Sequence, residues 1–366
     1  CFRRHSLSGL VPVATAMSFI DTIFAKLRRH PKRIVFPDGD DPRVVRACHA
    51  FYEKKVGIPV LIGNRDVIER VALAEKVSLD HVAIVNPETS SDLPVFCERF
   101  EKIDRYKKIG TRDTRSLMTN PNYYAAMMLQ FGQVDALVGG VNSYSGSLLR
   151  PLIQLVKQLP HSPFISGCLV AEVPDKKIGD DGVLFLADCG VVPDPNVEQL
   201  ASIAIQTGLV ARQVFGTRPR IAMLSFSTKG SAKTPSTEKV ARAVAIVREL
   251  ADRLGVEIAV DGEMQADAAL IPEIAHRKMG PSTVGGRANV LIFPELNSGN
   301  IGAKLVQYIG GARVYGQILL GLSRPAADMS RGADVDDIVA VAALVGLQAV
   351  EYRKLYPAEV VEPDVV

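Results

Sequence analysis

The chain has 366 residues, a formal net charge of +3, and a composition that is 47% hydrophobic and 23% charged. These values are typical of a globular protein of two domains, and so small a net charge gives no reason to expect a nucleic-acid partner. The absence of Trp and an aromatic content of 6% also leave few side chains on which bases could stack. The longest uncharged segment, Ile338 to Val350, is too short to cross a membrane and predicts a buried helix.

The cysteines and histidines show neither a disulfide pattern nor a metal-binding pattern. The five Cys are widely spaced without a CxxC motif, and the six His form neither HxxxH nor HExxH. This usage favours a reducing compartment, so we expect a cytoplasmic protein without a metal site.

Residues 1–16 differ from the rest of the chain because they contain Arg and Ser but no acidic residue. Such a segment is either the end of an organellar targeting peptide or an extension upstream of a start at Met17. The second interpretation is favoured, and we expect residues 1–16 to be disordered and to contribute nothing to the fold.

From Arg33 onward, short β-branched runs alternate with helical patterns. The predicted strands are 33–39, 56–63, 81–87, 135–140, 220–226, 257–263 and 290–296. The predicted helices are 41–55, 65–76, 147–159, 234–254 and 299–310. This alternation predicts an α/β fold in which helices cover both faces of a mainly parallel sheet.

Three of these strands are followed by loops rich in Gly, Ser and amide residues, at the position where open α/β sheets bind ligands. The loops are residues 139–146, 225–233 and 297–302. Their glycines allow a ligand to approach the backbone, and the helix after each loop offers free N–H groups to an anion. None is a P-loop or a complete GxGxxG motif, so together they indicate a ligand with several phosphates other than ATP or NAD. The loop residues expected to contact it are Ser145, Ser227, Thr228, Lys229, Gly230, Asn300 and Lys304.

A short acidic stretch contains Asp261, Glu263 and Asp267. Because no His accompanies these carboxylates, we interpret them as a cluster that braces a loop, in preference to a metal site.

A second acidic segment is more informative. Asp334 has the position of a helix N-cap, and Asp337 follows three residues later in the first turn. From the pattern alone, Asp337 either satisfies free N–H groups and the helix dipole or accepts a proton in a site shared with Ser330 and Arg331.

Several long stretches resemble the phosphotransacetylase (phosphate acetyltransferase) family, from about Met17 to Pro357. The stretches are RIVFPDGDDPRV, LLRP, FLADCGVVPDPN, RIAMLSFSTKGSAK, VDGEMQADAAL, ANVLIFPELNSGNIGAKLVQ and DMSRGADVDDIV. Their length and their order along the chain make the resemblance specific.

The resemblance implies two three-layer α/β domains with mainly parallel sheets and an active-site cleft between them. One domain would join residues 17–158 to 322–366, and the other would comprise 159–321. It also implies a homodimer, no metal, no tightly bound cofactor, and a reversible reaction of acetyl-CoA with inorganic phosphate that yields acetyl phosphate and coenzyme A (CoA).

By position in these motifs, the resemblance implies catalytic roles for Ser330, Arg331 and Asp337. Asp337 would remove the proton of the CoA thiol, of which only a few per cent is ionised at neutral pH. The thiolate would attack the acyl phosphate while Ser330 donates to the tetrahedral oxygen and Arg331 offsets negative charge. The resemblance further assigns substrate binding to Arg105, Arg150 and Lys304.

Some positions depart from the family pattern. Ser145 and Ser147 stand where the family often has Thr and Asp, and Lys176 stands where some members have Cys. These departures leave the acyl preference open, so phosphate butyryltransferase remains an alternative. A non-catalytic acetyl-CoA-sensing module is a second alternative, and the retention of Ser330, Arg331 and Asp337 argues against it.

Overall fold

The computed structural model of the chain describes residues 17–103, 106, 108–110, 113–159, 162 and 164–350. The expected N-terminal extension, Arg105 and residues 351–366 lie outside the described residues.

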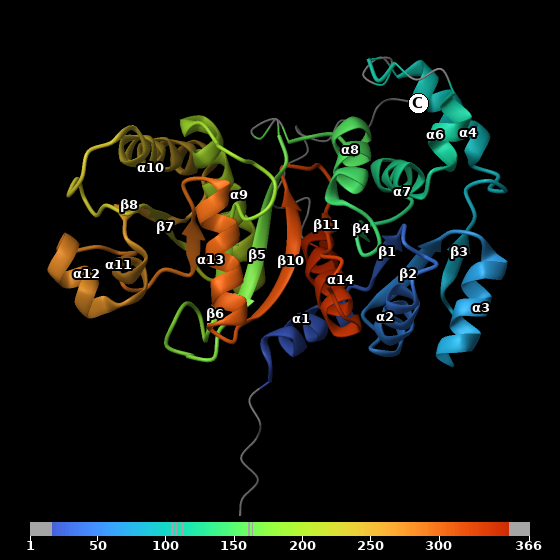
Figure 1. The fold of residues 1–366 in the computed structure, drawn as a ribbon, viewed down its shortest axis with the longest axis horizontal. Coiled ribbons are helices and arrows are strands. Elements are labelled where there is room, and N and C mark those ends of the chain that lie inside the picture. Colours follow the sequence, from blue (N-terminus) through green and yellow to red (C-terminus); the bar gives the residue numbers. More distant parts are fainter. Residues whose placement is uncertain are drawn as a thin grey trace, which may run out of the picture.

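Within this part of the chain, eleven strands form one continuous sheet in the order β3-β2-β1-β4-β11-β10-β5-β6-β9-β7-β8 (Figure 1). The strands are β1 (Lys32–Phe36), β2 (Gly57–Ile62), β3 (Ala83–Val85), β4 (Ala136–Gly139), β5 (Ser166–Glu172), β6 (Val183–Ala187), β7 (Arg220–Leu224), β8 (Ala259–Met264), β9 (Val290–Ile292), β10 (Arg313–Leu320) and β11 (Ala326–Asp328). Seven of the ten pairings are parallel, and the three antiparallel ones join β11, β10, β5 and β6 in the middle. The predicted α/β fold with a mainly parallel sheet is confirmed.

Helices pack on both faces of the sheet. They are α1 (Phe19–Arg28), α2 (Pro42–Glu53), α3 (Arg65–Glu75), α4 (Leu93–Lys102), α6 (Thr114–Thr119), α7 (Pro121–Gln130), α8 (Ser145–Leu155), α9 (Val197–Phe215), α10 (Pro235–Leu254), α11 (Ala266–Leu270), α12 (Pro272–Met279), α13 (Leu296–Tyr308) and α14 (Val335–Val350).

Local chemistry sets the ends of the predicted helices. In α10, the Thr234 side chain accepts from the Thr237 N–H, and the Thr237 side chain returns the bond, so two free donors of the first turn are satisfied. Pro235 occupies the first helical position, and Gly255 ends the helix at a φ of 63°. Each strand and helix predicted from the sequence has a counterpart of the same type.

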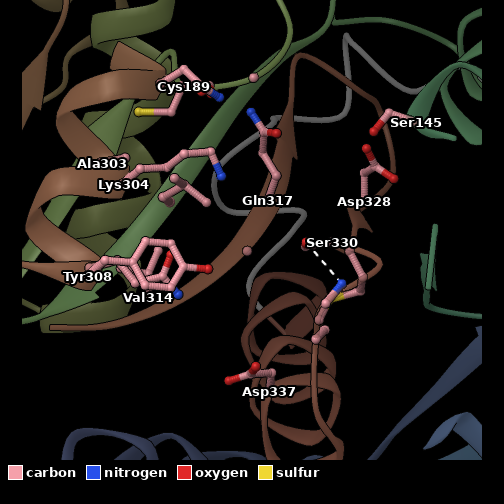
Figure 2. Close-up of a pocket in the computed structure, with 18 residues that line it drawn as sticks. Ser145, Cys189, Ala303, Lys304, Tyr308, Val314, Gln317, Asp328, Ser330 and Asp337 are labelled. Atoms are coloured by element: carbon pink, nitrogen blue, oxygen red, sulfur yellow. Dashed lines mark hydrogen bonds between the residues drawn. The ribbon is translucent and has the colours of Figure 1, made fainter. Parts of the chain in front are cut away.

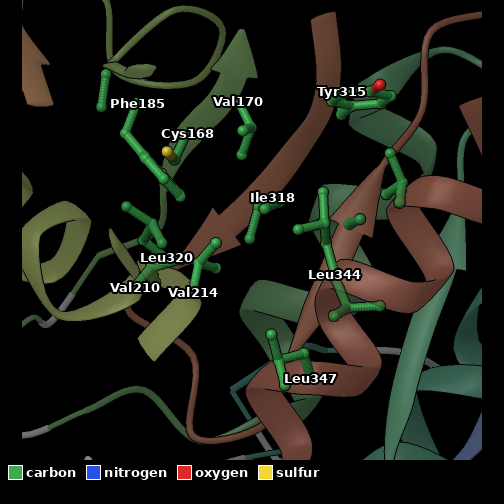
Figure 3. Close-up of a cluster of buried hydrophobic side chains, with 14 of the residues drawn as sticks. Cys168, Val170, Phe185, Val210, Val214, Tyr315, Ile318, Leu320, Leu344 and Leu347 are labelled. Carbon is green, nitrogen blue, oxygen red and sulfur yellow. The ribbon is translucent and has the colours of Figure 1, made fainter. Parts of the chain in front are cut away.

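The apolar core is arranged differently on the two faces of the sheet. One face carries a single cluster that runs across the whole sheet, in which α14 and α9 pack together over the middle strands. Figure 3 shows Leu344 and Leu347 of α14 facing Val210 and Val214 of α9, close to Ile318 of β10. The other face carries two separate clusters, one beneath α7 and α8 and one beneath α13. The second face therefore carries two separate apolar clusters instead of one, and the first of them includes Leu319 of β10 and Ala326 of β11.

The sheet and the first apolar cluster both continue across the boundaries expected between the two domains. The proposed boundaries at 158/159 and 321/322 fall beside the antiparallel strands in the middle of one sheet. The division into two domains stays a prediction.

We predict that Leu344→Ala lowers the free energy of unfolding by about 2–5 kcal/mol, because it removes a side chain from the shared core. Leu344 is fully buried, whereas Leu73 on α3 is 80% exposed. Leu73→Ala is the matched control and should change stability by no more than about 0.5 kcal/mol. Urea unfolding followed by circular dichroism measures both, and equal losses would contradict the core described for α14.

Candidate active site

A cavity of about 310 Å³ lies between α13, strand β10 and the segment that connects β11 to α14 (Figure 2). It opens on the face where the apolar cover is interrupted, with α8 on one side and α13 on the other. Five of the residues expected at the site line it: Ser145, Asn300, Lys304, Ser330 and Asp337.

The turn after β11 presents Ser330 to this cavity. The Ser330 carbonyl accepts from the Ala333 N–H at 3.0 Å, and its Oγ accepts from the Gly332 N–H at 3.2 Å. Because the hydroxyl also carries a proton, Ser330 can accept this bond and still donate to a ligand.

Asp337 lies in the first turn of α14, where a reciprocal cap holds it. The Asp337 N–H donates to Asp334 Oδ1 at 2.8 Å, and the Asp334 N–H donates to Asp337 Oδ2 at 3.2 Å. Partial burial raises the pKa of Asp337 above its ordinary value, assisted by Asp334 and Asp336 and opposed by the Asp334 N–H and Arg313. A carboxylate with a raised pKa is a stronger base, so the same side chain both caps the helix and offers a proton acceptor to the cavity.

Arg43, at the start of α2, ties the Ser330 turn to the neighbouring loop. Its Nη1 donates to the carbonyl oxygens of Arg331 at 2.6 Å and Ala333 at 3.1 Å. Its Nη2 donates to the Val141 carbonyl at 2.9 Å and to the Asp41 carboxylate at 2.9 Å. The position of Ser330 therefore depends on a residue that sequence reasoning did not select, although RIVFPDGDDPRV contains it.

On the opposite wall, α13 contributes Asn300 and Lys304. Asn300 Nδ2 donates to the Cys189 carbonyl at 2.9 Å, and the Lys304 side chain extends into the cavity (Figure 2). The prediction of a loop at residues 297–302 was wrong, because α13 already begins at Leu296. Glu295 accepts from the first N–H groups of α13, so an acidic side chain takes the donors that were expected to meet an anion.

The second predicted loop lies away from this cavity, between β7 and α10. Its residues proposed to bind substrate are Ser227, Thr228, Lys229 and Gly230. Glu263 accepts from Ser227 Oγ at 3.0 Å and from the Gly230 N–H at 2.6 Å, and Lys229 pairs with Asp261. The acidic stretch thus braces this loop, as the sequence predicted.

Arg331, expected to act beside Ser330, and Arg150, expected to bind a substrate phosphate, do not line the cavity. Arg331 is exposed, and its guanidinium carbon lies 4.5 Å from the centre of the Tyr144 ring. Arg150 is exposed on α8.

The polar residues that line the cavity but were not selected from the sequence include Asp328 and Gln317. Asp328 ends β11 and is 6% exposed. Gln317 lies on β10, and its side-chain amide fits against two glycines. A Cβ added at Gly167 would lie 1.7 Å from Gln317 Nε2, and a Cβ added at Gly190 would lie 2.1 Å from Gln317 Oε1. Each is a polar residue within or at the end of an apolar strand in the middle of the sheet. That break in an apolar run is the feature of the sequence that could have identified them as site residues.

The described residues also bear on metal binding, membrane insertion and disulfide formation. In the part of the chain described here, no group of three or more His, Cys, Asp or Glu side chains is placed to hold a metal ion. Among the same residues, no helix has the length and apolarity needed to cross a membrane. The described cysteines, Cys48, Cys97, Cys168 and Cys189, are all free.

The model of the phosphate acetyl/butaryl transferase family matches residues 18–345. The chain belongs to this family. A phosphate acetyltransferase of Thermoanaerobacterium thermosaccharolyticum is 40% identical over 333 residues, which cover 91% of this chain and 100% of the relative. One of Acetivibrio thermocellus is 38% identical, covering 91% of this chain and 98% of the relative.

A solved phosphotransacetylase from Streptococcus pyogenes has a TM-score of 0.83 at 34% identity, covering 92% of this chain and 100% of that structure. The family and the acyltransferase class expected from the sequence are therefore confirmed.

We predict that Asp334→Asn shifts the acid limb of the pH–rate profile to lower pH. Asn keeps the helix cap but removes a negative charge that raises the pKa of Asp337, so that pKa should fall. If Asp337 is a base, the rate declines as pH drops through this pKa, and the decline moves down with it. The control is Asp80→Asn, which removes an exposed acidic side chain just before the edge strand β3 and should leave the acid limb unchanged. A limb that stays in place or moves upward in Asp334→Asn would contradict the assignment.

Proposed function

We propose that this protein is a phosphate acetyltransferase, which transfers an acetyl group reversibly between acetyl phosphate and CoA. The observation that carries the proposal is that Ser330 and Asp337 face one cavity from a single turn and the helix that follows it. Relatives named phosphate acetyltransferase that align over 91% of the chain support acetyl as the group transferred. A longer acyl group, as in phosphate butyryltransferase, is the alternative that the family name retains.

In this proposal Asp337 acts on the thiol of CoA. Its carboxylate takes the thiol proton while the sulfur attacks the acyl carbon, so the S–H bond breaks as the C–S bond forms. The raised pKa makes the carboxylate a better acceptor for this proton. In the reverse direction the protonated Asp337 returns the proton to the departing thiolate.

Positive and hydrogen-bonding groups on both walls would support the tetrahedral intermediate. Ser330 donates to the developing oxyanion, and Lys304 on the opposite wall offsets charge on the phosphate. Arg331 lies over the exposed ring of Tyr144 and would turn toward the cavity when the anionic substrate binds.

The remaining binding roles concern the rest of CoA. The cavity of about 310 Å³ lies at the small end of ligand sites, so most of CoA would extend outside it. We assign the outer phosphates to the other residues expected to bind substrate, and the ligand would have to compete with Glu263 at the second loop. These residues are Arg105, Arg150, Ser227, Thr228, Lys229 and Gly230.

A homodimer, which the family resemblance implies, completes the proposal, and the cysteine usage favours a location in the cytoplasm. Light scattering coupled to size exclusion measures the mass in solution, and the mass of one chain would contradict the dimer.

We predict that Asp337→Asn lowers kcat by about 10²- to 10⁴-fold, the usual contribution of a general base. CoA binding, measured by calorimetry, should change little because Asn keeps the shape of the side chain. Asp336→Asn, at the neighbouring exposed position, is the matched control and should retain most turnover.

The assay follows thioester formation from CoA with acetyl, propionyl or butyryl phosphate, in the presence of EDTA. Failure of the wild type with all three acyl phosphates would reject the proposed function. Unchanged turnover in Asp337→Asn would reject only the role of Asp337.

A further inference from the structure

We propose that Asp328 is a second acid–base residue of this cavity, which gives a proton to the departing phosphate and takes it back in the reverse direction. The inference rests on the proposed function, because it concerns the leaving group of that reaction. It assigns the two ends of the cavity to the two products, the thioester sulfur near Asp337 and the phosphate near Asp328.

The backbone around Asp328 is built to admit a carboxyl group. Asp328 ends β11, where it pairs with Gly139 of the parallel strand β4. A Cβ added at the next residue, Gly140, would lie 2.1 Å from Asp328 Oδ1, so only glycine leaves room for this oxygen. In the described part of the chain, Oδ1 is buried and has no hydrogen-bond partner.

An ionised carboxylate with an unpartnered buried oxygen is costly, whereas a carboxylic acid needs fewer partners. The hydroxyl of Ser145, the first residue of α8, faces the other side of the Asp328 carboxyl (Figure 2). Ser145 also lines the cavity, so Asp328 and Ser145 form a pair at one end of it.

The order of the polar groups along the cavity fits the reaction. Figure 2 shows Ser330 between Asp337 on one side and Asp328 on the other. An acyl carbon whose oxygen accepts from Ser330 would therefore have the thiol toward Asp337 and the phosphate toward Asp328. A base at one end of a site and an acid at the other are well placed for acyl transfer between a thiol and a phosphate, because one group accepts the thiol proton and the other protonates the leaving oxygen.

The electrostatic surroundings support a proton on Asp328. Burial, together with the charge of Asp38 in the loop after β1, raises the pKa of Asp328 to about 6, against a lowering contribution from Ser145. The charged groups on the cavity side are Lys304 from α13 and Asp337 from α14. A phosphate dianion beside Asp328 would raise this pKa further, so the complex would hold the protonated acid.

The proton balance of the step closes without another reactant. The thiol proton passes to Asp337, the C–S bond forms, and the C–O bond breaks with its electron pair left on the phosphate oxygen. Asp328 gives its proton to that oxygen, so hydrogen phosphate leaves instead of the strongly basic trianion. Exchange with water then returns a proton to Asp328 and removes one from Asp337, which restores the resting enzyme.

The test uses Asp328→Asn, which keeps the size and hydrogen-bonding capacity of the side chain but cannot supply the proton. Thioester formation from acetyl phosphate should fall by at least about 10²-fold, the lower range for a general acid. The wild-type rate should decline at high pH as Asp328 loses its proton, and this alkaline limb should be absent in Asp328→Asn. Binding of inorganic phosphate, measured by calorimetry, should persist.

Two further variants separate the acid from a positioning role and guard against misfolding. Ser145→Ala should lower the rate less than Asp328→Asn does and should keep the alkaline limb. Asp38→Asn, which keeps an acceptor for the Val141 N–H but removes the like charge, should move the alkaline limb to lower pH.

An active wild type with near-normal turnover in Asp328→Asn would overturn this inference and leave the proposed function intact. The same conclusion follows if Ser145→Ala reproduces the full loss of rate, or if the alkaline limb stays in place in Asp38→Asn. A wild type inactive with every acyl phosphate would instead reject the proposed function itself.

Discussion

The site depends on how differently the two faces of the sheet are covered. On one face, α14 and α9 share a single apolar core over the middle strands, which holds the two halves of the molecule together. On the other face, α8 and α13 cover separate clusters, and the cavity lies between these two helices. Polar residues such as Gln317 and Asp328 can therefore occupy the middle of the sheet, where a third helix would have required apolar side chains.

This arrangement also makes the core responsible for the geometry of the site. Helix α14 is buried along most of its length, from Ile338 onward, while its first turn places Asp337 in the cavity. Arg43 fixes the turn before it by binding two of its carbonyl oxygens and a carbonyl of the loop after β4. Asp337 is held by a packed helix, and the turn that carries the Ser330 hydroxyl is held by the hydrogen bonds of Arg43. Both groups therefore need little rearrangement when substrate binds.

The sequence predicted the elements whose pattern is local, and it failed where the signal depends on distant parts of the chain. Alternating strands and amphipathic helices were found, but α9 is buried almost all round and shows little amphipathic period. Strand β11 has three residues, so its place between β4 and β10 follows only from pairing. Ser330 and Asp337 were identified through a motif, whereas Asp328 gains its meaning from Gly140 and from the cavity.

The same distinction explains why two glycine- and serine-rich segments do not present free donors. Composition alone cannot show that Glu263, on the neighbouring strand, accepts from Ser227 and Gly230, or that Glu295 caps α13. In the cavity, by contrast, Lys304 lies opposite two carboxyl groups, those of Asp337 and Asp328, whose surroundings differ. Asp337 accepts from an N–H and lies near Arg313 as well as near Asp334 and Asp336, whereas Asp328 has a buried, unpartnered oxygen and lies near Asp38 with no positive group beside it among the causes of its raised pKa. Two ionised carboxylates would repel a phosphate, so this asymmetry favours one base and one protonated acid when the phosphate is bound.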